Sequence, residues 1–116
     1  MRVEIRRVYD AAGAAGDYRV LVDRLWPRGV TKASLGLDEW DRDIAPSTEL
    51  RQWFGHDPER WDSFRRKYLL ELKGKAEQLE RLRTIARKKP LTLLYSAKDQ
   101  LRNQAAVLRE ALLSQR

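Results

Sequence analysis

The stretch LTLLY, residues 91–95, decides the fold of this chain. Pro90 stands directly before it and ends the helical pattern upstream, because proline restricts the residue that precedes it to extended conformations. The stretch is short and almost continuously apolar, which is the profile of a strand buried on both faces of a parallel sheet. Helical patterns lie on both sides of it, so the sequence predicts parallel strands joined by helical crossovers.

Two further strands are expected near the N-terminus. Residues 3–8 alternate apolar and charged side chains, which predicts a strand with one solvated face. Tyr18–Val22 carries apolar residues on both faces and is expected to be the parallel neighbour of Leu91–Tyr95. The small-residue stretch 11–17, AAGAAGD, indicates a hairpin tip, so the first two strands are expected to be antiparallel.

The middle of the chain predicts helices with defined ends. Ser47 is expected to cap a short helix that stops at Gly55, and Asp57 with Pro58 is expected to start the next. Gly74 breaks the following pattern, which otherwise continues to about residue 88. The apolar positions that recur every three or four residues are Trp61, Phe64, Tyr68, Leu72, Leu79, Leu82 and Ile85.

A last helix is expected after residue 95. Ser96–Asp99 matches a capping-box pattern. Its apolar face is predicted to comprise Leu101, Ala105, Leu108 and Leu112. The predicted fold class is therefore α/β: residues 1–116 form a small single domain with a short, mostly parallel or mixed sheet flanked by helices.

Composition excludes several classes of protein. A chain of 116 residues fits one domain with one core. No cysteine is present, which excludes disulfides, thiolate catalysis and thiolate metal sites. The longest apolar run has four residues, too few for a membrane span, and the N-terminus has no apolar signal-peptide region. We therefore expect a cytoplasmic protein without a membrane partner; the oligomeric state is left open.

The sharpest functional signal is VDRLWPRG, residues 22–29, in which a strand ends on Asp23, Arg24 and Arg28. Ligands of open α/β sheets bind at the carboxyl ends of the strands, near a switch in strand order. Polar residues follow the strand 91–95 as well, so both sets are expected to meet at that edge and to bind a phosphate- or carboxylate-bearing ligand. The residues in this second set are Ser96, Lys98, Asp99 and Asn103.

These residues suggest a division of roles. Asp23 and Asp99 are the candidate catalytic residues, for hydrolase- or transferase-type chemistry if the protein is an enzyme, a question that the sequence leaves open. The candidate ligand-binding residues are Arg24, Arg28, Ser96, Lys98 and Asn103, with Trp26 and His56 as accessory residues. The structural alternative is an Asp23–arginine ion pair, with Trp26 and Pro27 as core packing.

No cofactor or metal is predicted. The chain has one histidine, and its acidic stretch at residues 38–43 lacks the glycine and spacing of a calcium loop. Neither a GxxxxGK[ST] nor a GxGxxG motif is present, so no nucleotide is indicated by motif.

A second function, from a different class, rests on charge. The net charge is +7, with nine Lys/Arg against ten Asp/Glu in residues 1–58 and fifteen against seven in residues 59–116. This asymmetry predicts either a solvated helix surface or a module that binds nucleic acid or an acidic protein through residues 60–89. The basic residues concerned are Arg60, Arg65, Arg66, Lys67, Arg81, Arg83, Arg87, Lys88 and Lys89.

Three blocks together resemble the YeaO-like branch of the domain of unknown function 488 family: VDRLWPRG, APSTELRQWFGHDPERW and LTLLYSAKDQLRNQAAVL. They extend from residue 22 to residue 108, and the resemblance implies a small α/β protein of bacterial or archaeal origin. In other branches of the family, a cysteine-and-acid segment and a Cys-His-Arg triplet follow the last strand. Here the matching segment, YSAKDQLRNQA, has neither cysteine nor histidine, so thiol-based or rhodanese-like chemistry is not expected.

Overall fold

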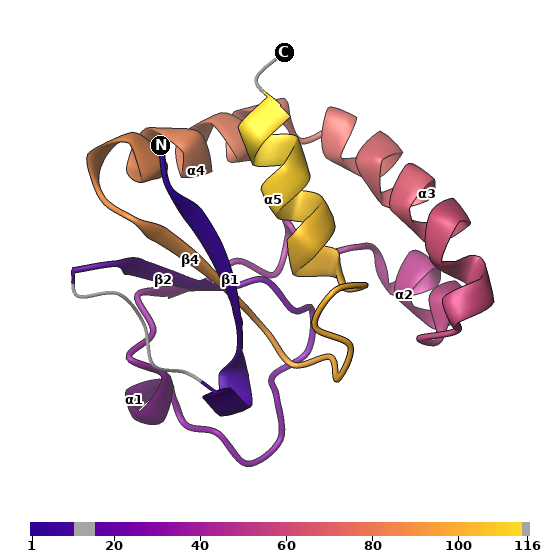
Figure 1. Ribbon diagram of the computed structural model, residues 1–116, viewed down its shortest axis with the longest axis horizontal. Coiled ribbons are helices and arrows are strands. Elements are labelled where there is room, and N and C mark those ends of the chain that lie inside the picture. The colour runs from indigo at the N-terminus through magenta and orange to yellow at the C-terminus, as the bar shows by residue number, and fades with distance from the viewer. Residues whose placement is uncertain (11–15, 115–116) are drawn as a thin grey trace.

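The structure is a computed structural model that describes residues 1–10 and 16–114. Within these residues, four strands form one parallel sheet in the order β1-β4-β2-β3, flanked by helices (Figure 1). The strands are β1 (Val3–Arg7), β2 (Tyr18–Leu21), β3 (Glu39–Trp40) and β4 (Leu91–Tyr95). The α-helices are α1 (Lys32–Leu35), α2 (Thr48–Phe54), α3 (Trp61–Lys73), α4 (Ala76–Lys88) and α5 (Gln104–Ser114), with short 3-10 turns η1 (Val8–Asp10) and η2 (Pro58–Arg60).

Strand β4 is the centre of the sheet, as its apolar sequence predicts. It pairs in parallel with β1 on one side and with β2 on the other, and all five of its residues are buried. The ladder to β2 continues one residue past the strand, because the Val22 N–H donates to the Leu94 carbonyl at 3.0 Å. The prediction that Tyr18–Val22 and Leu91–Tyr95 are parallel neighbours is confirmed.

The prediction that the first two strands are antiparallel is wrong. β1 and β2 do not pair with each other, because β4 lies between them and both run parallel to it. A strand that is almost continuously apolar is best placed between two neighbours, where both of its hydrogen-bonding edges are satisfied. Of the predicted hairpin tip, residues 11–15 lie outside the described residues.

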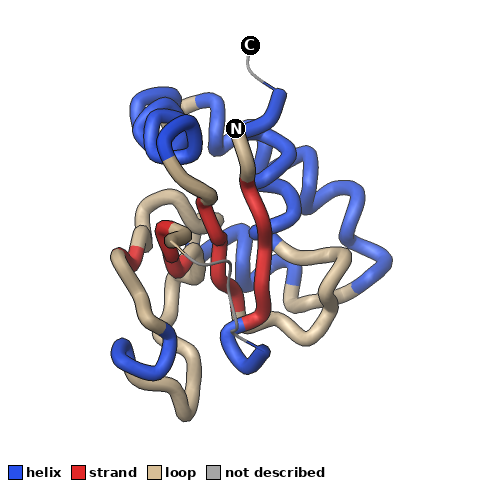
Figure 2. The backbone as a smooth tube through the Cα atoms, turned by 60° about the vertical axis from the view of Figure 1, so that its left-hand side comes forward, coloured by secondary structure: helices blue, strands red, loops and turns tan. Residues whose placement is uncertain are grey.

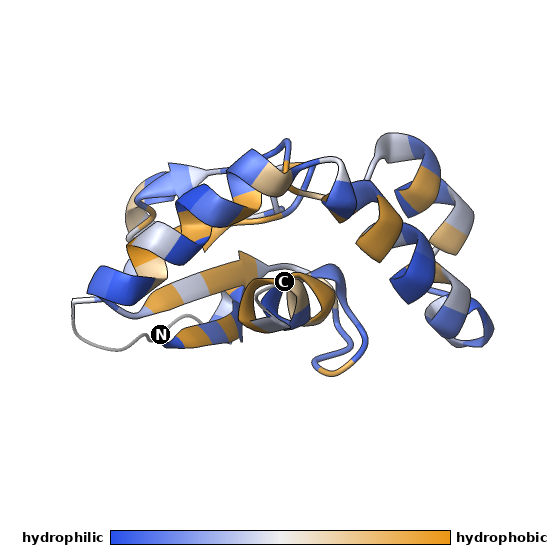
Figure 3. Cartoon of the chain, turned by 90° about the horizontal axis from the view of Figure 1, so that it is seen from above, coloured by the Kyte–Doolittle hydropathy of each residue, from blue (hydrophilic) through white to orange (hydrophobic). Residues whose placement is uncertain are grey.

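The two faces of the sheet are covered differently. One face, which includes Val20 and Leu93, packs into the main core with α2, α3, α4 and α5. The other face, which includes Leu21 and Leu94, packs against α1 and two half-buried tryptophans. Figure 2 shows α1 apart from the larger helices, and Figure 3 shows apolar residues alternating with hydrophilic ones along the helices.

The predicted helix boundaries between residues 47 and 74 are confirmed. The Ser47 hydroxyl accepts the Leu50 N–H at 3.1 Å, and α2 ends at Gly55 in a left-handed conformation. Asp57 caps the 3-10 turn that Pro58 opens, and Gly74 follows the last residue of α3. The buried faces of α3 and α4 comprise Phe64, Tyr68, Leu72, Leu79, Leu82 and Ala86.

The predicted start of the last helix is wrong. Helix α5 begins at Gln104, and the side chain of Asn103 caps it by accepting the Ala106 N–H at 2.9 Å. Leu101 is not on the apolar face, since it is 79% exposed. The capping box fails because Ser96 donates to Asp23, which follows β2, so residues 96–103 form a loop. Ala105, Leu108 and Leu112 are buried as predicted.

No helix in residues 1–10 and 16–114 is both long enough and apolar enough to cross a membrane. Over the same ranges, no group of three or more His, Cys, Asp or Glu side chains is arranged to hold a metal ion.

Candidate functional site

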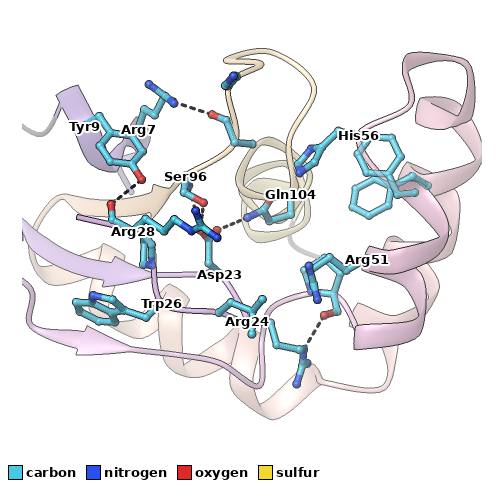
Figure 4. A pocket seen from close by; sticks show the side chains of 17 residues that line it. Arg7, Tyr9, Asp23, Arg24, Trp26, Arg28, Arg51, His56, Ser96 and Gln104 are labelled. Atoms are coloured by element: carbon cyan, nitrogen blue, oxygen red, sulfur yellow. Dashed lines mark hydrogen bonds between the residues drawn. The ribbon is translucent and has the colours of Figure 1, made fainter. Parts of the chain in front are cut away.

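A cleft of about 410 Å³ lies at the carboxyl edge of the sheet (Figure 4). Because β1, β4 and β2 are parallel, the segments that follow all three strands meet there. The turn after α2 closes the opposite side. Its charged and hydrogen-bonding side chains are Arg7, Tyr9, Asp23, Arg24, Trp26, Arg28, Arg51, His56, Ser96, Lys98 and Gln104. Five of these are Lys or Arg and one is acidic, so the cleft favours an anion.

Asp23 is the acidic residue of the cleft, and it is only 7% exposed. Its Oδ2 accepts the Ser96 backbone N–H at 3.0 Å and the Ser96 hydroxyl at 2.6 Å, while its Oδ1 accepts the Gln104 amide. Burial raises the pKa of Asp23, against the opposing effect of the Ser96 and Gln104 hydrogen bonds. These contacts connect the end of β2 to the end of β4 and to the start of α5.

The structural alternative for Asp23 is wrong. In the part of the chain that the structure describes, Asp23 forms no ion pair with any Lys, Arg or His. Its hydrogen-bond donors are neutral, and Arg24, one position along, points to backbone carbonyls instead.

Arg24 has a structural role. Its Nε donates to the Pro46 carbonyl at 2.8 Å and its Nη2 to the Ala45 carbonyl at 3.1 Å. Both carbonyls belong to the buried segment that leads into α2, so the guanidinium holds one wall of the cleft in place.

Trp26 packs as well as lining the cleft. Its indole N–H donates to the Val30 carbonyl at 2.9 Å, and its ring meets Trp40 edge-on with centroids 5.2 Å apart. The expected core packing of this tryptophan is therefore confirmed.

Arg28 and Lys98 are exposed residues that line the cleft, as the sequence predicts. Arg28 is held through its backbone, because the Tyr9 hydroxyl donates to its carbonyl at 2.9 Å. The Arg28 side chain points into the cleft (Figure 4), where it is available to a ligand.

His56 lines the cleft from the turn after α2 and has a strained backbone. Its φ of 56° lies in the left-handed region, which residues other than glycine rarely adopt. Its ring packs beside Phe54, with centroids 5.8 Å apart, and its charge lowers the pKa of Asp23, against the larger effect of burial. Such strain collects at functional sites and persists only where the surrounding structure holds it.

Two predicted site residues do not line the cleft. Asp99 is exposed, and its Oδ1 accepts the N–H groups of Leu101 and Arg102, both at 2.9 Å. These bonds lower the pKa of Asp99. Asn103 is buried as the cap of α5. Both residues therefore shape the loop before α5 rather than the cleft.

Four charged or hydrogen-bonding residues of the lining escape the sequence reasoning: Arg7, Tyr9, Arg51 and Gln104. Arg7 donates to the Ala97 carbonyl at 3.0 Å, and its guanidinium stacks over the Tyr9 ring at 4.7 Å. A signal for both existed, since Arg7 is the last residue of β1 and Tyr9 follows two positions later, but the expected hairpin placed that strand end at the opposite edge. Arg51 and Gln104 lie on α2 and α5 and carry no comparable signal.

The basic side chains of α3 and α4 are largely paired. Arg65 pairs with Glu110, Arg81 with Glu39 and Asp41, and Arg87 with Glu80. The Arg83 guanidinium donates to the last carbonyls of α5, at 2.9 Å each. Arg65, Arg81 and Arg83 thus hold elements of the domain together, whereas the Arg87–Glu80 pair lies within α4.

Comparison with known proteins places the chain in a family. The sequence matches the family described as "Inactive DUF488-N3 subclade" over residues 2–116. The chain belongs to this family. The predicted resemblance to the YeaO-like branch is confirmed, because "Uncharacterized protein YeaO" of Escherichia coli (strain K12) is 51% identical over 114 residues, 98% of this chain and 99% of the relative.

Two mycobacterial relatives are also similar. "Uncharacterized protein Rv3073c" of Mycobacterium tuberculosis (strain ATCC 25618 / H37Rv) and "Uncharacterized protein Mb3100c" of Mycobacterium bovis are each 40% identical over 111 residues, 96% of this chain and 93% of the relative. No solved structure matches the chain. None of these names states a ligand or a reaction, so a function has to be argued from the cleft.

Proposed function

We propose that this protein binds a small phosphate- or carboxylate-bearing molecule in the cleft at the carboxyl edge of the sheet. The observation that carries the proposal is the convergence of five Lys and Arg residues on one cleft with a single acid. They come from segments far apart in the sequence, which chance solvation of one helix face does not explain. Arginine is suited to such ligands because its planar fork matches the oxygens of carboxylates and phosphates.

The basic residues of the cleft have two roles: some hold its walls in place, and others are available to bind the ligand. Arg24 and Arg7 donate to backbone carbonyls and fix the walls. Arg28, Arg51 and Lys98 are exposed at the cleft, and in the described ranges none of the three forms an ion pair. These three are therefore the proposed anion-binding side chains, with His56 beside them. The cleft volume of about 410 Å³ is within the range of small-molecule sites.

The proposal is binding, with no reaction assigned. The chain has no cysteine, and the Ser96 hydroxyl donates to Asp23, a bond that it would have to break to act as a nucleophile. The family description, an inactive subclade, fits a binding role. A catalytic role for Asp23 stays a prediction, and Asp99 lies outside the cleft.

A thermal-shift screen of phosphate, sulfate, simple carboxylates and sugar phosphates tests the proposal. A ligand at one hundred times its dissociation constant stabilises the folded state by about 2.7 kcal/mol. We expect at least one anion to raise the melting temperature of the wild type, and Arg28→Met and Arg51→Met to reduce the shift. Arg66→Met is the matched control, since Arg66 is an exposed residue of α3 outside the cleft. The proposal is contradicted if no anion raises the melting temperature of the wild type, or if Arg66→Met reduces the rise as much as Arg28→Met and Arg51→Met do.

Nucleic-acid binding through residues 60–89 has less support, because Arg65, Arg81 and Arg87 are paired with carboxylates. Its own test is the salt dependence of duplex binding, whose log–log slope is about −0.9 per phosphate contacted. Tight, strongly salt-dependent binding that is lost in Arg66→Met but kept in Arg28→Met would favour this function instead.

A further inference from the structure

We propose that the ligand of the cleft is zwitterionic: it carries an ammonium group that binds Asp23 in addition to the anionic group that binds the exposed cations. This inference rests on the proposed function, because it concerns the same cleft, and it specifies the second charge of the ligand. The observation behind it is a buried carboxylate that forms no ion pair with the described residues, in the wall of a cleft that is otherwise basic.

Asp23 lines the cleft although it is only 7% exposed, and donors from two other segments hold both of its oxygens. The donors are the Ser96 N–H, the Ser96 hydroxyl and the Gln104 amide, so the carboxylate is fixed in one orientation. Figure 4 shows these bonds converging on Asp23 at the wall of the cleft.

The carboxylate charge of Asp23 is buried. Buried carboxylates in proteins are normally paired with a cation, because transferring an isolated charge out of water is costly. The donors to Asp23 from the described residues are neutral, and none of their basic nitrogens lies within 4.0 Å of its carboxylate; His56 acts on it from a longer distance. The raised pKa of Asp23 is consistent with this, since burial is its largest cause.

The described residues do not use the full hydrogen-bonding capacity of Asp23. An ionised carboxylate has about four acceptor sites, and Asp23 uses two on Oδ2 and one on Oδ1. One site on Oδ1 is therefore left for a ligand. An ammonium group fills it with a donor and supplies the missing positive charge, whereas a hydroxyl supplies the donor alone.

The cations of the cleft place the other end of the ligand. Arg28, Arg51 and Lys98 are exposed, whereas Asp23 is buried, so the anionic group is expected toward solvent and the ammonium group toward the sheet. The same cations repel amines that carry no anionic group. The cleft therefore selects molecules with both charges, such as amino acids and phosphorylated amines, over simple anions and simple amines.

Calorimetric titration with ligands of equal length tests this inference. Propyl phosphate, 2-hydroxyethyl phosphate and O-phosphoethanolamine present a methyl, a hydroxyl and an ammonium group at the same position. Butyrate and β-alanine form the corresponding pair for a carboxylate. We expect the wild type to bind the ammonium member of at least one series more tightly than its apolar counterpart by about tenfold or more, roughly 1.4 kcal/mol.

Asp23→Asn removes the charge and should abolish this preference while retaining affinity for the simple anion. Asp62→Asn, at an exposed acid on α3, is the matched control and should retain the preference. If Asp23→Asn does not fold, as judged by circular dichroism, the wild-type comparison decides alone.

The outcomes separate the two proposals. Equal binding of the apolar and ammonium members, or tightest binding of the hydroxyl member, overturns the zwitterion inference and leaves the anion site standing. Binding of no member of either series contradicts the proposed function itself. A preference for ammonium that persists in Asp23→Asn also overturns the inference, because another residue would then bind the amine.

Discussion

Replacing Arg24 by methionine should lower stability and replacing Arg28 by methionine should not, although both residues follow β2 and line the same cleft. Methionine keeps a long apolar stem and removes the guanidinium. Arg24 donates to the Pro46 carbonyl at 2.8 Å and to the Ala45 carbonyl at 3.1 Å. Within the described residues the Arg28 side chain forms no ion pair, and the Tyr9 contact is to its backbone carbonyl, which the substitution retains.

The expected loss of stability in Arg24→Met follows from the two hydrogen bonds that the Arg24 guanidinium donates. A hydrogen bond from a charged group contributes about 1.5–3 kcal/mol. The Pro46 carbonyl loses its donor, whereas the Ala45 carbonyl keeps a weaker contact to Lys75 at 3.3 Å. We therefore expect Arg24→Met to lower the free energy of unfolding by about 2–4 kcal/mol. In a domain of this size the melting temperature should fall by roughly 10 °C.

Urea unfolding followed by circular dichroism measures the effect. Arg28→Met should stay within about 0.5 kcal/mol of the wild type, as surface substitutions usually do. If the free energy of unfolding falls with urea concentration at the same slope in each variant, the comparison concerns stability rather than compactness of the unfolded state. Equal losses in both variants, or a stable Arg24→Met, would show that the division between scaffold and ligand-binding arginines is wrong.

Three further substitutions test single features of the structure. Tyr68→Phe removes a buried hydroxyl that donates to the Ile44 carbonyl at 2.6 Å, and should cost about 1–3 kcal/mol in urea unfolding; an unchanged midpoint would mean that this carbonyl finds another donor. Asn103→Ala removes the cap of α5 and should cost about 0.5–2 kcal/mol. A full-stability Asn103→Ala protein would argue against the assigned start of that helix. His56→Gly relieves a left-handed backbone and should raise stability by about 1 kcal/mol while weakening anion binding. Lower stability in that variant, measured by thermal unfolding, would show that the imidazole contributes more than the strain costs.

The central strand could be predicted because its sequence is unambiguous. Leu91–Tyr95 is apolar on both faces, so a buried position with parallel neighbours follows from the pattern. Strand order could not be read in the same way. Residues 11–17 are rich in small residues and look like a hairpin tip, whereas the pairing of β1 depends on which edge of β4 is open, a tertiary property.

The candidate site was partly predictable for a related reason. Asp23, Arg28, Ser96 and Lys98 follow β2 and β4, and two parallel strands bring their ends to one edge. Asp99 was misplaced because the loop from residue 96 to 103 turns away before α5, and its course depends on the bond between Ser96 and Asp23. That contact joins residues 73 positions apart, and no local pattern records it.

The central claim, that the cleft at the carboxyl edge binds an anion, is tested most directly by nuclear magnetic resonance of the wild-type protein titrated with inorganic phosphate. The signals to follow are the backbone amide of Ser96, the side-chain amide of Gln104 and the Nε–H groups of Arg28 and Arg51. We expect saturable shifts of these signals together, with one dissociation constant, and little change at the Arg65 and Arg87 Nε–H groups on α3 and α4. Shifts confined to the helix arginines, or weak shifts spread without saturation over all basic residues, would contradict it.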